Sequence, residues 1–203
     1  MSFEQTPVAI IIMFLTGAFS FFALYSKYDL RKFLFVPYEV FYKKRYWQFL
    51  SGGFLHADLV HLMFNMLTYY FFAFQFEALV GSVPFLIIYL ASMILADVPS
   101  FIKNRNNPMY RSIGASGAVS GIIFGSLLLN PGMSLMMFPI PINIPAPVFA
   151  VLYLTYCIIA KRFAKDGINH SAHLWGAIAG FLLTMLMVPD SLRNFVAQIL
   201  KSL

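Results

Sequence analysis

Charge is scarce in this sequence. Only 11% of the 203 residues are Asp, Glu, Lys or Arg, whereas a soluble domain carries about 25%. Hydrophobic residues make up 60% of the chain, and the mean hydropathy is +0.77. So few charges cannot cover the surface of a soluble protein, but lipid replaces water around a polytopic membrane protein. The composition therefore predicts a membrane protein that crosses the bilayer several times.

Cysteine is nearly absent as well. The lone Cys157 excludes an intramolecular disulfide, and its apolar neighbours indicate an inert packing residue. No basic run is interleaved with polar aromatic residues, so the net charge of +6 does not point to nucleic acid. In a membrane protein such a charge reports on topology and on anionic headgroups. A signal peptide is not expected, because residues 1–7 contain Glu4 and no Lys or Arg.

Six apolar segments are each close to the ~20 residues that cross a bilayer as a helix. Polar loops separate the later segments, for example residues 103–108 and 161–167, and no internal repeat is visible. We therefore predict an all-α polytopic membrane protein with one six-helix domain over residues 1–203. The predicted spans are residues 7–25, 58–76, 83–101, 112–129, 144–160 and 171–188.

Two connections stand out. Residues 26–55 combine six Lys or Arg residues with many aromatic residues, a mixture that suits the headgroup layer. We therefore expect an ordered interfacial element there, with a turn at Gly52 and Gly53 before the second span. A proline-rich stretch, residues 139–147, leads into the fifth span.

Four polar side chains occupy the first turns of three spans. They are His61 and Asn65 on the second span, Ser116 on the fourth and His173 on the sixth. These spans cross in the same direction, so their first turns lie at one membrane face. Ser116 and His173 are each within about one turn of a helix start, and His61 and Asn65 share one helix face. The spacing predicts that the four groups lie at similar depth.

Small residues recur at every fourth position on the fourth and sixth spans. Such stripes let membrane helices approach closely, and helix packing explains either stripe taken alone. However, Ser116 and His173 each adjoin one stripe, so contact between the stripes would make them face each other. The stripe residues are Gly117, Gly121 and Gly125 on the fourth span, and Ala172, Gly176 and Gly180 on the sixth.

A serine facing a histidine suits nucleophilic acyl transfer. The serine hydroxyl needs a neighbouring base, which His173 can supply. The tetrahedral intermediate needs hydrogen-bond donors, which His61, Asn65 and the backbone N–H of Ser116 can supply. A structural role for a single buried His or Asn is the alternative. A metal site at His56, His61 and His173 is disfavoured by the five-residue spacing and by the lack of a nearby acidic or Cys ligand.

These residues resemble the motifs of the rhomboid intramembrane serine proteases in their basic six-span form. The resemblance covers nearly the whole chain and implies Ser116 as nucleophile and His173 as general base, without an acidic member. It implies His61, Asn65 and the Ser116 backbone as the oxyanion hole, and it requires no cofactor or metal. The motifs are His56-x4-His61-x3-Asn65, Gly114-x-Ser116-Gly117 and Ala172-His173-x2-Gly176-x3-Gly180.

Two positions depart from the family pattern. The first loop usually carries Trp-Arg but reads Trp47-Gln48 here, and Gln lacks the bidentate cationic fork of Arg. The aromatic residue that commonly follows the serine by four and packs under the histidine is Ser120 here. We expect Trp175, Phe124 or another ring to fill that place.

The family also has a Glu-x3-Gly pair at the far end of the second span, which Glu77 and Gly81 resemble. A structural role is expected for this glutamate rather than a catalytic one.

Loop charges bear on orientation. The loops after the first, third and fifth spans carry six, three and three Lys or Arg residues, and the opposite side has Arg193 and Lys201. The positive-inside rule would turn the active-site face toward the cytoplasm. The family resemblance implies an active site toward the extracytoplasmic face of the plasma membrane, and that is the orientation we expect.

The sequence thus favours an intramembrane serine endopeptidase that cleaves transmembrane protein substrates near one membrane face. The alternative is a non-catalytic rhomboid-like protein that binds or escorts membrane clients. A transporter or channel would require central charges or inverted repeats, and Asp97 is the only acidic candidate. The expected partners are transmembrane substrates and membrane lipids, not nucleic acid, and the sequence makes no prediction of oligomeric state.

Overall fold

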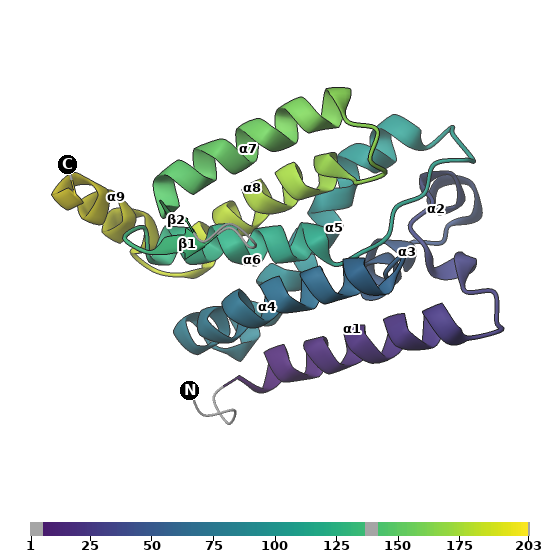
Figure 1. The fold of residues 1–203 in the computed structure, drawn as a ribbon, viewed down its shortest axis with the longest axis horizontal. Coiled ribbons are helices and arrows are strands. Elements are labelled where there is room, and N and C mark those ends of the chain that lie inside the picture. The colour runs from purple at the N-terminus through teal and green to yellow at the C-terminus, as the bar shows by residue number, and fades with distance from the viewer. Residues whose placement is uncertain (1–5, 137–141, 203) are drawn as a thin grey trace.

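The computed structural model describes residues 6–136 and 142–202. Helices dominate these residues, and the strands described there form one short antiparallel hairpin, so the all-α prediction is confirmed (Figure 1). Part of the proline-rich stretch, residues 139–141, lies outside the described residues. The long helices are α1 (Pro7–Tyr25), α4 (Leu59–Val80), α5 (Ser82–Asn104), α6 (Ser116–Leu129), α7 (Ala146–Phe163), α8 (His170–Met187) and α9 (Ser191–Ser202). The shorter elements are η2 (Arg31–Phe33), α2 (Pro37–Lys43), α3 (Gln48–Ser51), η3 (Gly52–Phe54), β1 (Ser134–Met136) and β2 (Asn143–Pro145).

Five of the described helices, α1, α4, α5, α7 and α8, are long and apolar enough to cross a membrane. The fourth predicted span is α6, an apolar helix of only 14 residues, about 21 Å long. Nearly all of its side chains are buried, because it packs against α4, α5, α7 and α8. Because protein rather than lipid surrounds α6, this helix does not need the length of a lipid-exposed span.

Several predicted boundaries need correction. The fourth helix begins at Ser116, four residues later than predicted, because Gly114 has a φ of +116° that ends any helix before it. The second span continues to Val80, and Gly81 is its C-cap. The third span continues to Asn104, although Pro99 lies inside it. The apolar pattern located each helix, whereas local backbone geometry decided its ends.

Helices α4, α6 and α8 run in the same direction, and their first turns lie at one end of the bundle (Figure 1). The loops that follow α1, α5 and α7 gather at that end as well. The parallel course of the three helices, predicted from the order of the spans, is therefore present in the fold.

The closest helix packing joins α6 to α8. A Cβ atom added to Gly176 would overlap the carbonyl group of Gly117, and one added to Gly180 would overlap that of Gly121. The two backbones therefore touch without intervening side chains. Helices in lipid associate through such van der Waals contact, because lipid tails are as apolar as the side chains they replace. The predicted contact between the stripes is present.

The first connection is ordered around the buried side chain of Gln48. Its Oε1 accepts a hydrogen bond from the backbone N–H of Val36 at 3.0 Å. Its Nε2 donates to the carbonyl of Lys32 at 3.0 Å and to Glu39 Oε2 at 2.9 Å. Arg45 supplies a cation to the same carboxylate oxygen at 2.8 Å. Gln48 and Arg45 together therefore provide the hydrogen bonds and the charge that a single Arg could provide.

Glu77 joins α4 to the start of α1. Its carboxylate is fully buried and accepts hydrogen bonds from the backbone N–H groups of Val8 at 3.1 Å and Ala9 at 2.6 Å. The hydroxyl of Ser82 donates to it at 2.6 Å. Because the first N–H groups of a helix have no partner within the helix, Glu77 supplies what α1 lacks. This contact has the structural character expected for Glu77.

Candidate active site

Ser116 and His173 meet at the end of the bundle where α6 and α8 begin. Ser116 is the first residue of α6, and His173 lies in the first turn of α8. His173 Nε2 is 2.7 Å from Ser116 Oγ, which is hydrogen-bonding distance. Both residues are half-buried and line a cavity of about 1340 Å³.

The chain enters α6 through a turn that only glycine fits. Gly114 has a φ of +116°, and a Cβ there would lie 2.7 Å from His61 Cε1. The backbone N–H of the next residue, Ala115, points to His56 Nε2 at 3.5 Å. These contacts fix the segment that carries Ser116 against the histidines that precede α4 or lie in its first turn.

His56 is the buried anchor of this segment. Its Nδ1 lies 2.8 Å from Ser20 Oγ, and Ser20 donates to the carbonyl of Phe54 at 2.9 Å. Burial, together with the nearby His61, lowers the pKa of His56 to about 3, so the ring is neutral at physiological pH. The accepting Nε2 and the donating Nδ1–H then define one tautomer that connects α1 to the entry of α6.

His61 and Asn65 line the same cavity as Ser116 and His173. Asp58 caps α4 by accepting from the backbone N–H of His61 at 2.7 Å. Asn65 Nδ2 donates to the carbonyl of His61 at 3.1 Å. An amide nitrogen carries two N–H groups, so one remains. The cavity therefore brings together all four polar side chains that the sequence singled out.

The histidines do not form a metal cluster. Within residues 6–136 and 142–202 there is no group of three or more His, Cys, Asp or Glu side chains placed to hold a metal ion. His56 instead packs against the His61 ring, with the ring centroids 4.8 Å apart at an angle of 72°.

Ser120 does not pack under His173. Its hydroxyl donates to the carbonyl of Ser116 at 2.8 Å and lies 2.7 Å from the hydroxyl of Tyr153 on α7. The ring that contacts His173 is His170, at a centroid distance of 5.9 Å. Of the expected candidates, Phe124 packs on Tyr153 instead, and Trp175 is 40% exposed. The ring in contact with His173 is therefore neither of the two rings that the sequence named.

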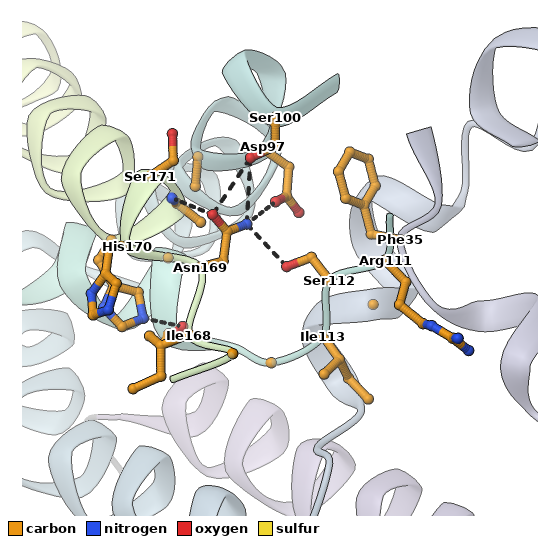
Figure 2. A pocket seen from close by; sticks show the side chains of 18 of the residues that line it. Phe35, Asp97, Ser100, Arg111, Ser112, Ile113, Ile168, Asn169, His170 and Ser171 are labelled. Carbon is orange, nitrogen blue, oxygen red and sulfur yellow. Dashed lines mark hydrogen bonds between the residues drawn. The ribbon is translucent and has the colours of Figure 1, made fainter. Parts of the chain in front are cut away.

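Asn169 is a positioned residue that the sequence reasoning missed. Its Oδ1 caps α8 by accepting from the backbone N–H of Ala172 at 3.1 Å. Its Nδ2 donates to Ser112 Oγ at 3.0 Å and lies 3.5 Å from Asp97 Oδ1 and 3.4 Å from Ser100 Oγ. Figure 2 shows the Asn169 amide among these side chains. An Asn just before a helix is an N-cap signal, but its partners on α5 have no sequence signature.

Comparison with known proteins agrees with this architecture. The family model for the Rhomboid domain matches residues 43–190. The chain is 34% identical over 136 residues to rhomboid protease GluP of Bacillus subtilis (strain 168), covering 67% of this chain and 25% of GluP. It is 30% identical over 158 residues to the rhomboid protein YdcA of the same organism, covering 74% of this chain and 71% of YdcA. It is also 26% identical over 143 residues to Inactive rhomboid protein 1 of Drosophila melanogaster, covering 70% of this chain and 10% of that protein.

The family match extends over most of the chain, and the described helices have the lengths and apolar character of a multi-pass membrane protein. The chain therefore belongs to the rhomboid family.

Proposed function

We propose that this protein is an intramembrane serine endopeptidase in which Ser116 is the nucleophile and His173 the general base. The observation that carries the proposal is the 2.7 Å contact between Ser116 Oγ and His173 Nε2. A serine hydroxyl is a weak nucleophile until a neighbouring base accepts its proton. The relatives GluP and YdcA, whose names describe rhomboid proteases, support the same reaction class.

The proposed reaction proceeds in two halves. Ser116 Oγ attacks the carbonyl carbon of the scissile peptide bond while its proton passes to His173 Nε2. The C–N bond then breaks, and His173 returns the proton to the leaving amine, which leaves an acyl ester on Ser116. A water molecule, deprotonated by His173, attacks the ester, and its proton is returned to Ser116 Oγ as the acid product leaves.

The negative charge on the intermediate needs fixed donors. We assign this role to the His61 ring, the free amide N–H of Asn65 and the backbone N–H of Ser116, which line or border the same cavity. The Ser116 N–H belongs to the first turn of α6, where N–H groups have no partner within the helix. Preorganised donors of this kind contribute about 3–4 kcal/mol each to transition-state stabilisation.

The substrates we propose are transmembrane proteins. Ser116 and His173 lie within the first turns of membrane helices, so the bond that reaches them lies near one face of the bilayer. A peptide bond inside a transmembrane helix is covered by its own hydrogen bonds and must unwind before attack. We therefore expect cleavage beside small or helix-destabilising residues, without a cofactor or metal.

For the orientation, we propose that the active-site end faces the extracytoplasmic side of the plasma membrane, as the family resemblance implies. The 12 Lys and Arg residues in the loops at that end, against two on the opposite side, argue for the reverse orientation. Labelling of single cysteines with a membrane-impermeant maleimide in intact cells decides between them. A cysteine in the loop after α5 should be labelled from outside, and one in α9 only after permeabilisation.

A second candidate function is the binding or escort of membrane clients without cleavage. The match to a relative named Inactive rhomboid protein 1 favours this candidate, because the family includes a protein with that name. Such a protein would use the same cavity, but it would not need an activated serine.

A serine-directed fluorophosphonate probe separates the two functions. The purified wild-type protein in detergent should become labelled, and Ser116→Ala and His173→Ala should each reduce the labelling rate by at least about 10³-fold. Ser126→Ala is the matched control, because Ser126 is a buried hydroxyl on α6 that bonds to the carbonyl of Ile122. It should label at the wild-type rate.

Labelling that requires both Ser116 and His173 supports the peptidase. A folded wild-type protein that stays unlabelled, or labelling that persists in Ser116→Ala, would favour the client-binding function instead.

A further inference from the structure

A second histidine stands directly behind His173. His170 is the first residue of α8, one turn before His173, and it is only 3% exposed. The two imidazole rings meet edge to face, with centroids 5.9 Å apart at an angle of 79°. Edge-to-face contact is a favoured geometry for rings, because the positive edge of one meets the negative face of the other. His170 therefore limits how the His173 ring can turn.

The His170 ring is itself held from two other sides. Its Nε2 lies 3.0 Å and 3.2 Å from the two carboxylate oxygens of Asp166, in the loop before α8. On another side it meets the ring of Tyr156 on α7 at 5.3 Å and 90°. A backbone hydrogen bond from Ile168 at 3.0 Å fixes the carboxylate in turn. That bond and the His170 contact lower the pKa of Asp166, so the group is an anion at neutral pH.

The polarity of His170 has a cost that packing alone does not explain. Its Nδ1 is buried and has no hydrogen-bond partner among the described residues. An unsatisfied buried polar atom costs about 1–3 kcal/mol, and such atoms are uncommon in native structures. A phenylalanine would fill the same space without that cost. The position therefore favours a role that uses the imidazole and its bond to Asp166.

We propose that Asp166 and His170 form a positioning pair that orients His173 toward Ser116. His170 takes the place of the aromatic ring that Ser120 cannot supply, and Asp166 fixes the His170 ring through its Nε2. The proposal rests on the proposed function, in which His173 is the base. An acidic group would then influence the reacting pair through a second imidazole rather than by direct contact.

The electrostatic setting gives the carboxylate a second effect. His173 becomes a cation when it takes the Ser116 proton, and it does so at the N-terminal end of α8. The positive end of the helix dipole disfavours a cation there. The negative charge of Asp166, which is in contact with the neighbouring His170, opposes that effect. In serine proteases with an acidic member, the carboxylate likewise orients the imidazole and stabilises the imidazolium.

The test measures the second-order rate constant for fluorophosphonate labelling of the full chain in detergent. His170→Ala, which removes the ring and the link to Asp166, should lower this rate about 10-fold or more, as loss of an orienting partner commonly does. His170→Phe, which keeps a ring, should lower it less, by about 3-fold. Asp166→Asn should also lower the labelling rate by about 3-fold. Combining Asp166→Asn with His170→Phe should cost less than the sum of the two single losses, because without the imidazole the carboxylate keeps only its electrostatic effect on His173.

Asp190→Asn is the matched control, since it makes the same chemical change in the loop before α9 and should leave the rate unchanged. Thermal unfolding identifies any variant that fails to fold. Wild-type rates in folded His170→Phe and Asp166→Asn proteins would overturn the proposal, as would fully additive losses in the double variant.

A readout independent of activity is the ¹⁵N spectrum of the His173 ring in histidine-labelled protein, assigned by its loss in His173→Ala. Asp166→Asn and His170→Phe should each shift the His173 nitrogen resonances, whereas Asp190→Asn should not. Unchanged His173 resonances in both variants would overturn the positioning role. If the wild-type protein is not labelled by the probe, the proposed function fails, and this spectrum still decides the positioning role.

Discussion

Two polar clusters lie at opposite ends of α4, and they differ in how many of their donors and acceptors have hydrogen-bond partners. At the far end, the Glu77 carboxylate is completely buried and accepts from two backbone N–H groups and one hydroxyl. At the near end, His61 and Asn65 line a cavity. Among the described residues, the His61 ring nitrogens have no hydrogen-bond partner, and Asn65 uses only one of its amide N–H groups.

This difference separates polar groups that are paired within the protein from polar groups that remain available to bind a ligand. A buried polar group without a partner is costly where water is absent. The fully buried Glu77 avoids that cost through three donors within the protein, and its burial leaves no access for a ligand. The groups around Ser116 retain donors that face a cavity, so a ligand or water must complete them. Hydrogen-bond saturation, rather than burial alone, distinguishes the two clusters.

The largest effect is expected from a substitution that prevents the fold and so disrupts both clusters at once. Gly180→Ala places a methyl group into the carbonyl of Gly121, where backbone meets backbone. We expect the bundle to fail to form, seen as loss of monodisperse protein on size-exclusion chromatography. Gly17→Ala is the control, because a Cβ there meets nothing within 4 Å. A well-folded Gly180→Ala protein would show that the contact between α6 and α8 is not as tight as the structure describes.

The next effect should be confined to the cavity end. Asn65→Ala removes one proposed oxyanion donor, and we expect the rate of cleavage of a transmembrane substrate to fall about 10²-fold. The loss should be smaller than that of Ser116→Ala, because His61 and the backbone N–H of Ser116 remain. The free energy of unfolding should change little. A large loss of stability with normal activity would instead make Asn65 a structural residue like Glu77.

The opposite result is expected at the far end. Glu77→Ala leaves the N–H groups of Val8 and Ala9 without their acceptor. We expect a loss of about 3 kcal/mol in the free energy of unfolding, measured by thermal or steric-trap unfolding. The labelling rate per folded molecule should stay at the wild-type value. A change in that rate with unchanged stability would contradict the division between the two clusters.

The smallest effect concerns Glu39 in the first connection. Burial alone would raise its pKa, but hydrogen bonds from Lys43 and Gln48 and the charge of Arg45 outweigh burial and hold it below its usual value. A carboxyl group whose pKa is lower in the folded state stabilises the protein above its unfolded pKa, and the stabilisation is lost as the pH falls through the folded pKa. Glu39→Gln should therefore cost under about 1 kcal/mol at pH 7.

The pH series provides the check on Glu39. Thermal unfolding of the wild type and of Glu39→Gln should differ at pH 7 and converge as the pH falls through the lowered pKa of Glu39, where the wild-type carboxyl group becomes protonated. A difference that stays constant across this range would mean that the charge of Glu39 contributes nothing.

The sequence predicted those features that depend on periodicity. The apolar runs located six helices, and the four-residue spacing of Gly117 and Gly121 against Gly176 and Gly180 predicted the contact between α6 and α8. That contact explains why Ser116 Oγ and His173 Nε2, each on a residue next to a stripe, lie 2.7 Å apart in the structure. The repeat of small residues was sufficient to predict this contact, because Ser116 and His173 both lie near helix starts at the same end of the bundle.

Features that depend on partners from other elements could not be read in this way. Tyr153 meets Ser120 from α7, and no spacing in the sequence connects the two. His170 and His173 are three residues apart, which is a readable signal for a shared helix face. Asp166 was harder to find, because it lies in the loop before α8, where helical periodicity does not apply.

The enclosure of α6 has a consequence for how the protein responds to its bilayer. Helices such as α1 and α7, with only 22% and 17% of their apolar windows buried, meet acyl chains directly and must tilt or adapt when membrane thickness changes. The 14-residue α6 does not, because its neighbours enclose it and its backbone is fixed to α8. The hydroxyl on Ser116 should therefore react at the same rate in thin and thick bilayers, and any dependence on acyl-chain length should arise in substrate entry rather than in chemistry.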